Sequence, residues 1–194
     1  GQHAAGLPAE TVSKFQMSFL AVQEVYFLNA VLTKCALLCL YYRIFGISRR
    51  FTIAIYVVGV LVVSYFIVCV VLSIAGCQPV SYFWNKAQAG RCFNEVNFFR
   101  ANGITNMLLD ITVLILPLPM VWRLDLELRQ KLAVTGMFLL GSFVCVTSIL
   151  RILAFRTSKQ SDPTYTTIDT ATWSSVEQSL GIVCACLPTL RPLF

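Results

Sequence analysis

Residues Asn106–Pro119, with the sequence NMLLDITVLILPLP, form an apolar run that has a carboxylate, Asp110, near its middle. Apolar residues extend this run to about Phe98–Trp122, which at ~1.5 Å per helical residue is long enough to cross the ~30 Å hydrocarbon core of a bilayer. Asn102, Asn106 and Asp110 are four residues apart and therefore lie along one stripe of an α-helix. An ionised carboxylate at this depth is unfavourable by about 2.5–3.5 kcal/mol, so we expect the stripe to face the interior of a helix bundle.

The composition of the 194-residue chain is that of a membrane protein. Hydrophobic residues make up 57% of it and charged residues only 12%, with a mean hydropathy of +0.74, whereas about a quarter of a soluble domain is charged. Spanning β-strands would be ~10-residue alternating segments, and the apolar runs do not alternate. The sequence therefore predicts an all-α, polytopic transmembrane helix bundle without a second domain. The five predicted spans are about Met17–Phe45, Thr52–Ala75, Phe98–Trp122, Leu132–Phe155 and Ile168–Leu190.

The chain begins at Gly1 with a polar segment that has no apolar core of a secretory signal, and we expect it to be a fragment of a longer protein. The net charge of +6 comes from Lys and Arg residues spread over the loop edges. This distribution favours membrane flanking over nucleic-acid binding. Arg49–Arg50 and Arg129–Lys131 could also contact anionic lipid or a cytosolic partner.

Two of the eight cysteines, Cys77 and Cys92, bracket the loop between the second and third predicted spans. A disulfide between them would persist only on the oxidising side of the membrane, which would place this loop and the segment Gly1–Lys14 outside. Two unpaired thiols are the alternative. The basic residues divide almost equally between the two sides, so the charge distribution alone does not settle the orientation.

Other polar side chains within the spans are candidate partners of Asp110. Lys34 lies well inside the first span, and charge and depth favour a Lys34–Asp110 ion pair, although protonation could neutralise Asp110 instead. The last span contains TWSSVEQSLG around Glu177, which is too polar to face lipid and is typical of the wall of a wet cavity. The predicted interior site for a small polar or amphipathic ligand comprises Glu24, Lys34, Asn102, Asn106, Asp110 and Glu177.

A purely structural role is the alternative for the same residues. Intramembrane polar side chains often serve only to join helices, and each hydrogen bond between helices stabilises the bundle by about 0.6 kcal/mol. A Lys34–Asp110 pair could likewise only fix the packing. Function is favoured slightly for Glu177, whereas the two roles are balanced for Lys34 and Asp110.

The sequence contains no signature of an enzyme. His3 is the only histidine, which rules out a His-based metal cluster or catalytic triad within these residues, and no nucleotide-binding or nucleophile-elbow motif is present. We therefore predict no catalytic, cofactor or metal site. A retinal protein needs a buried lysine in its last helix, and Ile168–Leu190 has none, so we expect the protein not to be photoactive.

Several motifs, spread over nearly the whole chain, are shared with one known family. They are LTKCALLCLYYRIF (32–45), CQPVSYFW (77–84) with GRC (90–92), NMLLDITVLILPLPMVWRL (106–124), GSFVCVTSILRI (141–152), SDPTY (161–165) and WSSVEQSLGIVCACLPTLRPLF (173–194). On these motifs the chain resembles the fungal rhodopsin-like integral membrane family. That family includes receptor-like proteins, some with a CFEM domain, and membrane proteins of secondary-metabolite clusters such as the satratoxin cluster.

The resemblance implies a seven-helix bundle with its N-terminus outside, of which this chain would supply five spans and lack the first two. Lys34, Asp110 and Glu177 match positions of the family motifs, and the resemblance assigns them no established role. It implies a receptor-like protein, in the plasma membrane rather than internal membranes, that senses a small ligand and signals to a cytosolic partner. The alternatives are a small-metabolite transporter, a membrane scaffold or accessory protein, or an unrecognised enzyme of secondary metabolism.

Overall fold

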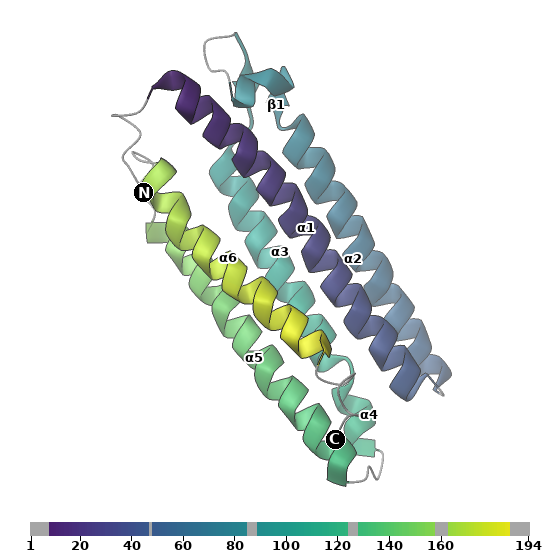
Figure 1. Ribbon diagram of the computed structural model, residues 1–194. Helices are drawn as coiled ribbons and strands as arrows, with labels where there is room; N and C mark the ends of the chain where they lie inside the picture. The colour runs from purple at the N-terminus through teal and green to yellow at the C-terminus, as the bar shows by residue number, and fades with distance from the viewer. Residues whose placement is uncertain (1–7, 47, 85–88, 124–127, 158–162, 187–194) are drawn as a thin grey trace.

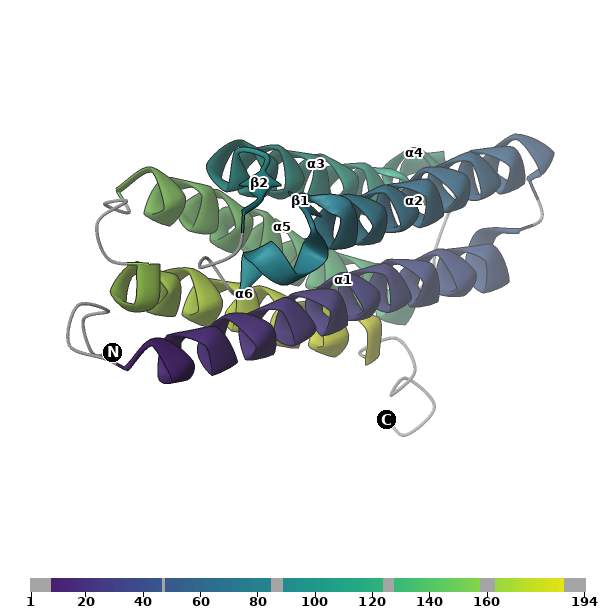
Figure 2. The ribbon, with the colours of Figure 1, turned by 90° about the horizontal axis from the view of Figure 1, so that it is seen from above.

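The computed structural model describes residues 8–46, 48–84, 89–123, 128–157 and 163–186, and within them the chain is an elongated helix bundle (Figure 1). The helices are α1 (Ala9–Phe45), α2 (Arg49–Ala75), α3 (Glu95–Ile115), α4 (Leu118–Arg123), α5 (Leu128–Thr157) and α6 (Pro163–Cys186). α1 packs against α2 on one side and α6 on the other, while α5 packs against both α6 and α3. Figure 2 shows the same arrangement from above, with all five long helices along one axis. The predicted all-α class is confirmed.

The five long helices correspond to the five predicted spans, but several of their ends differ. α1 begins at Ala9 rather than near Met17, directly after Pro8, whose fixed φ suits a helix start. The third predicted span, about Phe98–Trp122, is interrupted near its end. α3 ends at Ile115 and α4 follows from Leu118, because Pro117 has no N–H to donate and its ring clashes with the preceding turn.

The last helix begins at Pro163, earlier than predicted, with proline again at the first helical position. The final residues of the predicted span Ile168–Leu190 lie outside the described part of the chain. Helix α5 covers the fourth predicted span, Leu132–Phe155, with additional residues at both ends.

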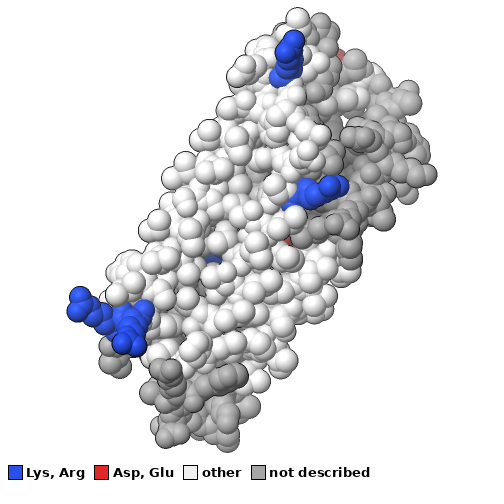
Figure 3. Space-filling view, turned by 180° about the vertical axis from the view of Figure 1, so that it is seen from behind, with Lys and Arg blue, Asp and Glu red and all other residues white. Residues whose placement is uncertain are grey.

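Three helical segments within the described residues are long and apolar enough to cross a membrane: Glu10–Ile44, Arg49–Ala75 and Asn97–Met120. α5 contributes a shorter apolar segment, Phe138–Leu150. Most of the face seen from behind is uncharged, with a group of Lys and Arg at its lower end (Figure 3), as expected for a surface in contact with lipid. The count of five spans stays a prediction.

The packing between α1, α2 and α3 is apolar. Buried side chains from all three helices meet in one cluster, which consists of Val31, Leu38, Tyr41, Phe51, Ile55, Val58, Val62, Leu109 and Val113. This cluster joins α2 to the rest of the bundle and thereby fixes the position of α1, on which part of the candidate site lies.

The loop between α2 and α3 is closed by a disulfide between Cys77 and Cys92, as predicted. The two cysteines are paired opposite each other in a short antiparallel ladder of β1 (Cys77–Gln78) and β2 (Arg91–Cys92). A 3₁₀ turn, η2 (Val80–Phe83), follows β1. The ladder was not predicted, because strands of two residues are too short to show an alternating pattern.

We expect a membrane-impermeant maleimide added to intact cells to label neither Cys77 nor Cys92 until a reductant is supplied. The thiols are consumed in the disulfide, and the predicted outer placement of the loop would make them accessible to the reagent once they are reduced. The measurement is the labelling of the wild-type protein minus the labelling of a Cys77→Ser/Cys92→Ser variant. This subtraction removes any signal from the other cysteines. Labelling before reduction would disprove the disulfide, and protection after reduction would contradict the outer placement of this loop.

Candidate functional site

The polar stripe predicted on α3 faces the bundle interior. Asn102 and Asn106 are buried, and Asp110 is mostly buried. The helix that carries them begins at a capped end, where the side chain of Asn94 accepts a hydrogen bond from the backbone N–H of Asn97 at 3.2 Å. From this stripe, Asp110 contacts α1 and Asn106 contacts α1 and α6, whereas Asn102 contacts α2.

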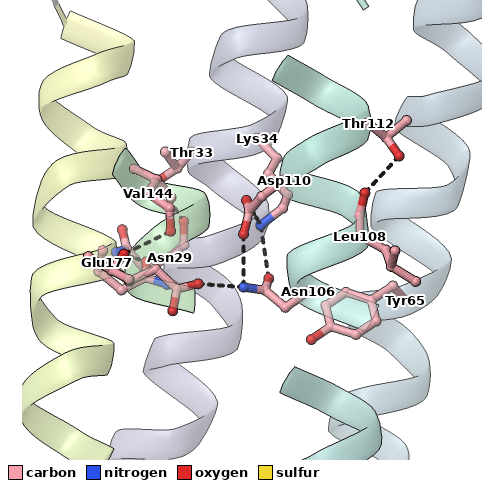
Figure 4. A network of polar contacts seen from close by, with 12 residues as sticks. Asn29, Thr33, Lys34, Tyr65, Asn106, Leu108, Asp110, Thr112, Val144 and Glu177 are labelled. Atoms are coloured by element: carbon pink, nitrogen blue, oxygen red, sulfur yellow. Dashed lines mark hydrogen bonds and ion pairs between the residues drawn. The ribbon is translucent and has the colours of Figure 1, made fainter. Parts of the chain in front are cut away.

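The structure brings Lys34 of α1 and Asp110 of α3 together. Lys34 Nζ lies 2.8 Å from Asp110 Oδ1, with 6% of the lysine side chain and 15% of the aspartate side chain exposed. The same ammonium group donates a hydrogen bond to Asn106 Oδ1 at 2.9 Å (Figure 4). Such charge-assisted hydrogen bonds are about twice as strong as neutral ones, so both contacts hold the lysine against α3.

Asn106 extends the network to α6. Its Nδ2 donates to Glu177 Oε1 at 2.6 Å and to Asp110 Oδ2 at 3.2 Å (Figure 4). Glu177 is buried, and its Oε1 also accepts a hydrogen bond from the Tyr26 hydroxyl of α1 at 3.4 Å. One amide therefore connects a cation and two carboxylates from three different helices.

A second contact joins α1 to α6 next to this network. Asn29 Nδ2 donates to Gln178 Oε1, and Asn29 also accepts at its backbone carbonyl from the Thr33 hydroxyl at 2.8 Å. Asn29 and Gln178 are visible in the sequence as polar residues within spans, but nothing in it shows that they meet. Tyr26 is missed by sequence reasoning, because a tyrosine within a span carries no signal of a polar partner.

A cavity of about 60 Å³ lies beside the network. Its polar lining comes from Lys34, Asp110, Glu177, Gln178, Thr33 and Tyr41. Pockets for drug-sized ligands have volumes of about 300–1,000 Å³, whereas a water needs only about 10–15 Å³ of such space. In this conformation the cavity therefore has room for a few waters or one small polar group.

Three of the predicted site residues, Glu24, Asn102 and Asn106, do not line this cavity. Asn102 Oδ1 instead accepts hydrogen bonds from the Tyr65 hydroxyl and from Cys69 Sγ, both on α2. Glu24 lies ten residues before Lys34, or ~15 Å along α1 at 1.5 Å per residue. The predicted interior site is thus divided into two parts. The inner network consists of Lys34, Asn106, Asp110 and Glu177, and the outer part consists of Glu24 and Asn102.

The residues 1–194 match the profile of the fungal rhodopsin domain along their whole length. The chain belongs to the fungal rhodopsin domain family. No solved structure matches it significantly.

Three curated relatives illustrate what this fungal rhodopsin domain is similar to. The polyenoic acids biosynthesis gene cluster protein Ba17b of Metarhizium anisopliae is 30% identical over 100% of this chain and 56% of its own length. The SAT4 family membrane protein of Emericella nidulans is 29% identical over 100% of this chain and 51% of its own. Receptor GIN3 of Arthrobotrys oligospora is 30% identical over 90% of this chain and 43% of its own. The chain spans about half the length of these relatives.

Among the described residues of this fungal rhodopsin domain, the buried lysine lies on α1 and not on α6. α6 (Pro163–Cys186) contains no lysine that could form a Schiff base there. The buried lysine, Lys34, is on α1 and paired with Asp110. Among the described residues, no group of three or more His, Cys, Asp or Glu side chains is placed to hold a metal ion.

We expect Asp110→Leu alone to destabilise the protein by about 3–5 kcal/mol, because it leaves the Lys34 ammonium buried without its counter-charge. The double variant Lys34→Met/Asp110→Leu should recover most of this loss. Thermal unfolding of the two single variants and the double variant in detergent measures the coupling.

Lys14 and Glu10 provide a matched control, since they form an ion pair of the same 2.8 Å length with 74% and 78% of their side chains exposed. Lys14→Met and Glu10→Leu should change the unfolding midpoint little, as exposed pairs contribute little. An equal loss of stability from breaking the Lys34–Asp110 pair and the Lys14–Glu10 pair would contradict a buried pair. Additive losses of stability for the Lys34 and Asp110 substitutions would contradict coupling between them.

Proposed function

We propose that this fungal rhodopsin domain is the membrane-spanning part of a receptor-like protein that senses a small ligand and is not photoactive. It would contribute five spans, with the disulfide loop outside, in the plasma membrane. The family, the multi-pass helical fold and the similarity to a protein named as a receptor support this proposal. The ligand site would be the inner network of Lys34, Asn106, Asp110 and Glu177.

The observation that carries the proposal is that this network joins three helices through exchangeable polar contacts. Lys34 comes from α1, Asn106 and Asp110 from α3, and Glu177 from α6. A ligand with a polar group could replace one of these partners, because it can offer the same donor or acceptor. It would then favour a different spacing of the helices, and a ligand shifts an equilibrium only by such a difference in affinity between states.

The size of the cavity limits the ligand group that enters this conformation. A volume of about 60 Å³ fits the polar end of a molecule, such as an amine, hydroxyl or carboxylate, with the remainder among the helices or in the lipid. A larger ligand would require α1 and α6 to separate, which would break the Asn29–Gln178 contact. In either case binding changes the contacts between the same helices.

The end of the bundle between α1 and α2, which we expect to be cytosolic, could pass the change in helix contacts to a cytosolic partner. Arg43 is in the last turn of α1, and Arg49 and Arg50 are in the first turn of α2. All three side chains are exposed. A movement of α1 relative to α3 would move this basic turn, which anionic lipid or an acidic surface on a partner could recognise.

A role in secondary metabolism is the second candidate, either as a transporter of a small metabolite or as an accessory membrane protein. It is favoured by the names of relatives, which include Ba17b of a polyenoic acids cluster and the satratoxin biosynthesis SC1 cluster protein 4 of Stachybotrys chartarum. The same polar interior could carry a metabolite if the helices opened alternately to the two sides. Flux of a metabolite into vesicles that contain the full-length protein, without any cellular signal, would favour transport.

In cells that express the full-length gene, we expect Glu177→Gln to weaken a ligand-dependent signal at least roughly tenfold in ligand concentration. The substitution keeps an acceptor for Asn106 but removes the negative charge, and a hydrogen bond to a charged group contributes about 1.5–3 kcal/mol. Dose–response curves at matched surface expression measure the effect. Ser179→Ala on the exposed side of α6 is the control. An unchanged dose–response for Glu177→Gln would contradict the proposed site.

A further inference from the structure

Glu24 of α1 is a half-buried acid whose carboxylate has no hydrogen-bond partner. Both of its carboxylate oxygens are shielded almost completely, and neither accepts a hydrogen bond. It is outside the lining of the inner cavity, where Lys34 is paired with Asp110. An ionised carboxylate whose oxygens are shielded inside a bundle is costly unless its charge is compensated, so a cation at this place would stabilise it.

The polar side chains near Glu24 direct their hydrogen bonds elsewhere. Gln23 Nε2 donates to Ser73 Oγ at 3.2 Å, which places this level of α1 beside the outer half of α2. Cys69 is one helical turn from Ser73 on α2 and lies within electrostatic range of Glu24. Its thiol, however, donates to Asn102 Oδ1 at 3.3 Å. The Tyr65 hydroxyl also donates to Asn102. These donors are therefore committed to Ser73 and Asn102, and Glu24 receives none of them.

We propose that Glu24 is the anionic ligand of a monovalent cation site between α1, α2 and α3. One carboxylate supplies one negative charge, which an alkali-metal ion or a small ammonium ion balances. Carboxylate, amide and hydroxyl oxygens are hard ligands that suit such ions. The described residues lack a group of three His, Cys, Asp or Glu side chains, as a transition metal would require. This outer site is separate from the inner network and does not depend on the proposed receptor function.

The test is the thermal unfolding of the purified full chain in detergent at constant ionic strength, monitored by tryptophan fluorescence. Sodium, potassium or methylammonium chloride replaces N-methylglucamine chloride, whose cation is too large to enter. We expect a saturable rise of the unfolding midpoint by roughly 3–6 °C with at least one of the small cations, because a ligand that binds only the folded state stabilises it. The cation that produces the rise distinguishes an alkali-metal site from an ammonium site.

Glu24→Gln should abolish this rise while leaving the protein folded, since it removes the charge and keeps the shape. Glu10→Gln, the same substitution at an exposed position of α1, should retain the rise in full. If Glu24→Gln does not fold, Glu24→Asp replaces it, and a shift of the half-saturating cation concentration is then expected.

Identical midpoints of the wild-type protein in all four salts would overturn the proposal without any variant. A rise that persists in Glu24→Gln would overturn it as well. A midpoint that depends on pH but on none of the salts would show that a proton alone neutralises Glu24, which is also incompatible with a cation site.

Discussion

The arrangement of α1, α3 and α6 depends on the side-chain amide of Asn106. It is only 1% exposed, and it accepts from Lys34 at one end while donating to Asp110 and Glu177 at the other. An amide offers both an acceptor and two donors, so it can satisfy a cation and two anions at once. An aspartate at this position could not donate, and a leucine could do neither. Asn106 is therefore the one residue of this network that is bonded to all three helices' charged groups, Lys34, Asp110 and Glu177.

This constraint has particular weight in lipid. Helices in a bilayer gain nothing from burying apolar side chains against each other that lipid tails would not also provide, so close packing and polar contacts determine which helices associate. α2 is joined to α1 and α3 mainly by the apolar cluster around Val58 and Val62. α6 is joined to α1 by Asn29–Gln178 and to the network by Glu177. Apolar packing therefore holds α2 in the bundle, whereas polar contacts hold α6.

Sequence reasoning was sufficient where the signal is local. The four-residue spacing of Asn102, Asn106 and Asp110, and the position of Cys77 and Cys92 at the two ends of one loop, can be read directly. It was insufficient where helices distant in the chain meet. Depth favoured Lys34 as the partner of Asp110, but nothing in the sequence placed Asn106 between them, or Tyr26 against Glu177. Glu24 was predicted to share one site with Lys34, Asp110 and Glu177. A polar residue within a span is easily recognised in the sequence, but the sequence does not show which other side chains it meets.

The polar burial along α1 has a consequence for how the chain enters the membrane during synthesis. α1 carries Gln23, Glu24 and Lys34 within its span, whereas α2 from residue 51 to residue 75 contains no charged side chain. The groups that contact the Lys34 ammonium, Asp110 and Asn106, are on α3, which is synthesised later. α1 therefore cannot reach its final environment when it leaves the ribosome. The Lys34 side chain meets its partners only after α3 has been made, so a later helix controls the stability of an earlier one.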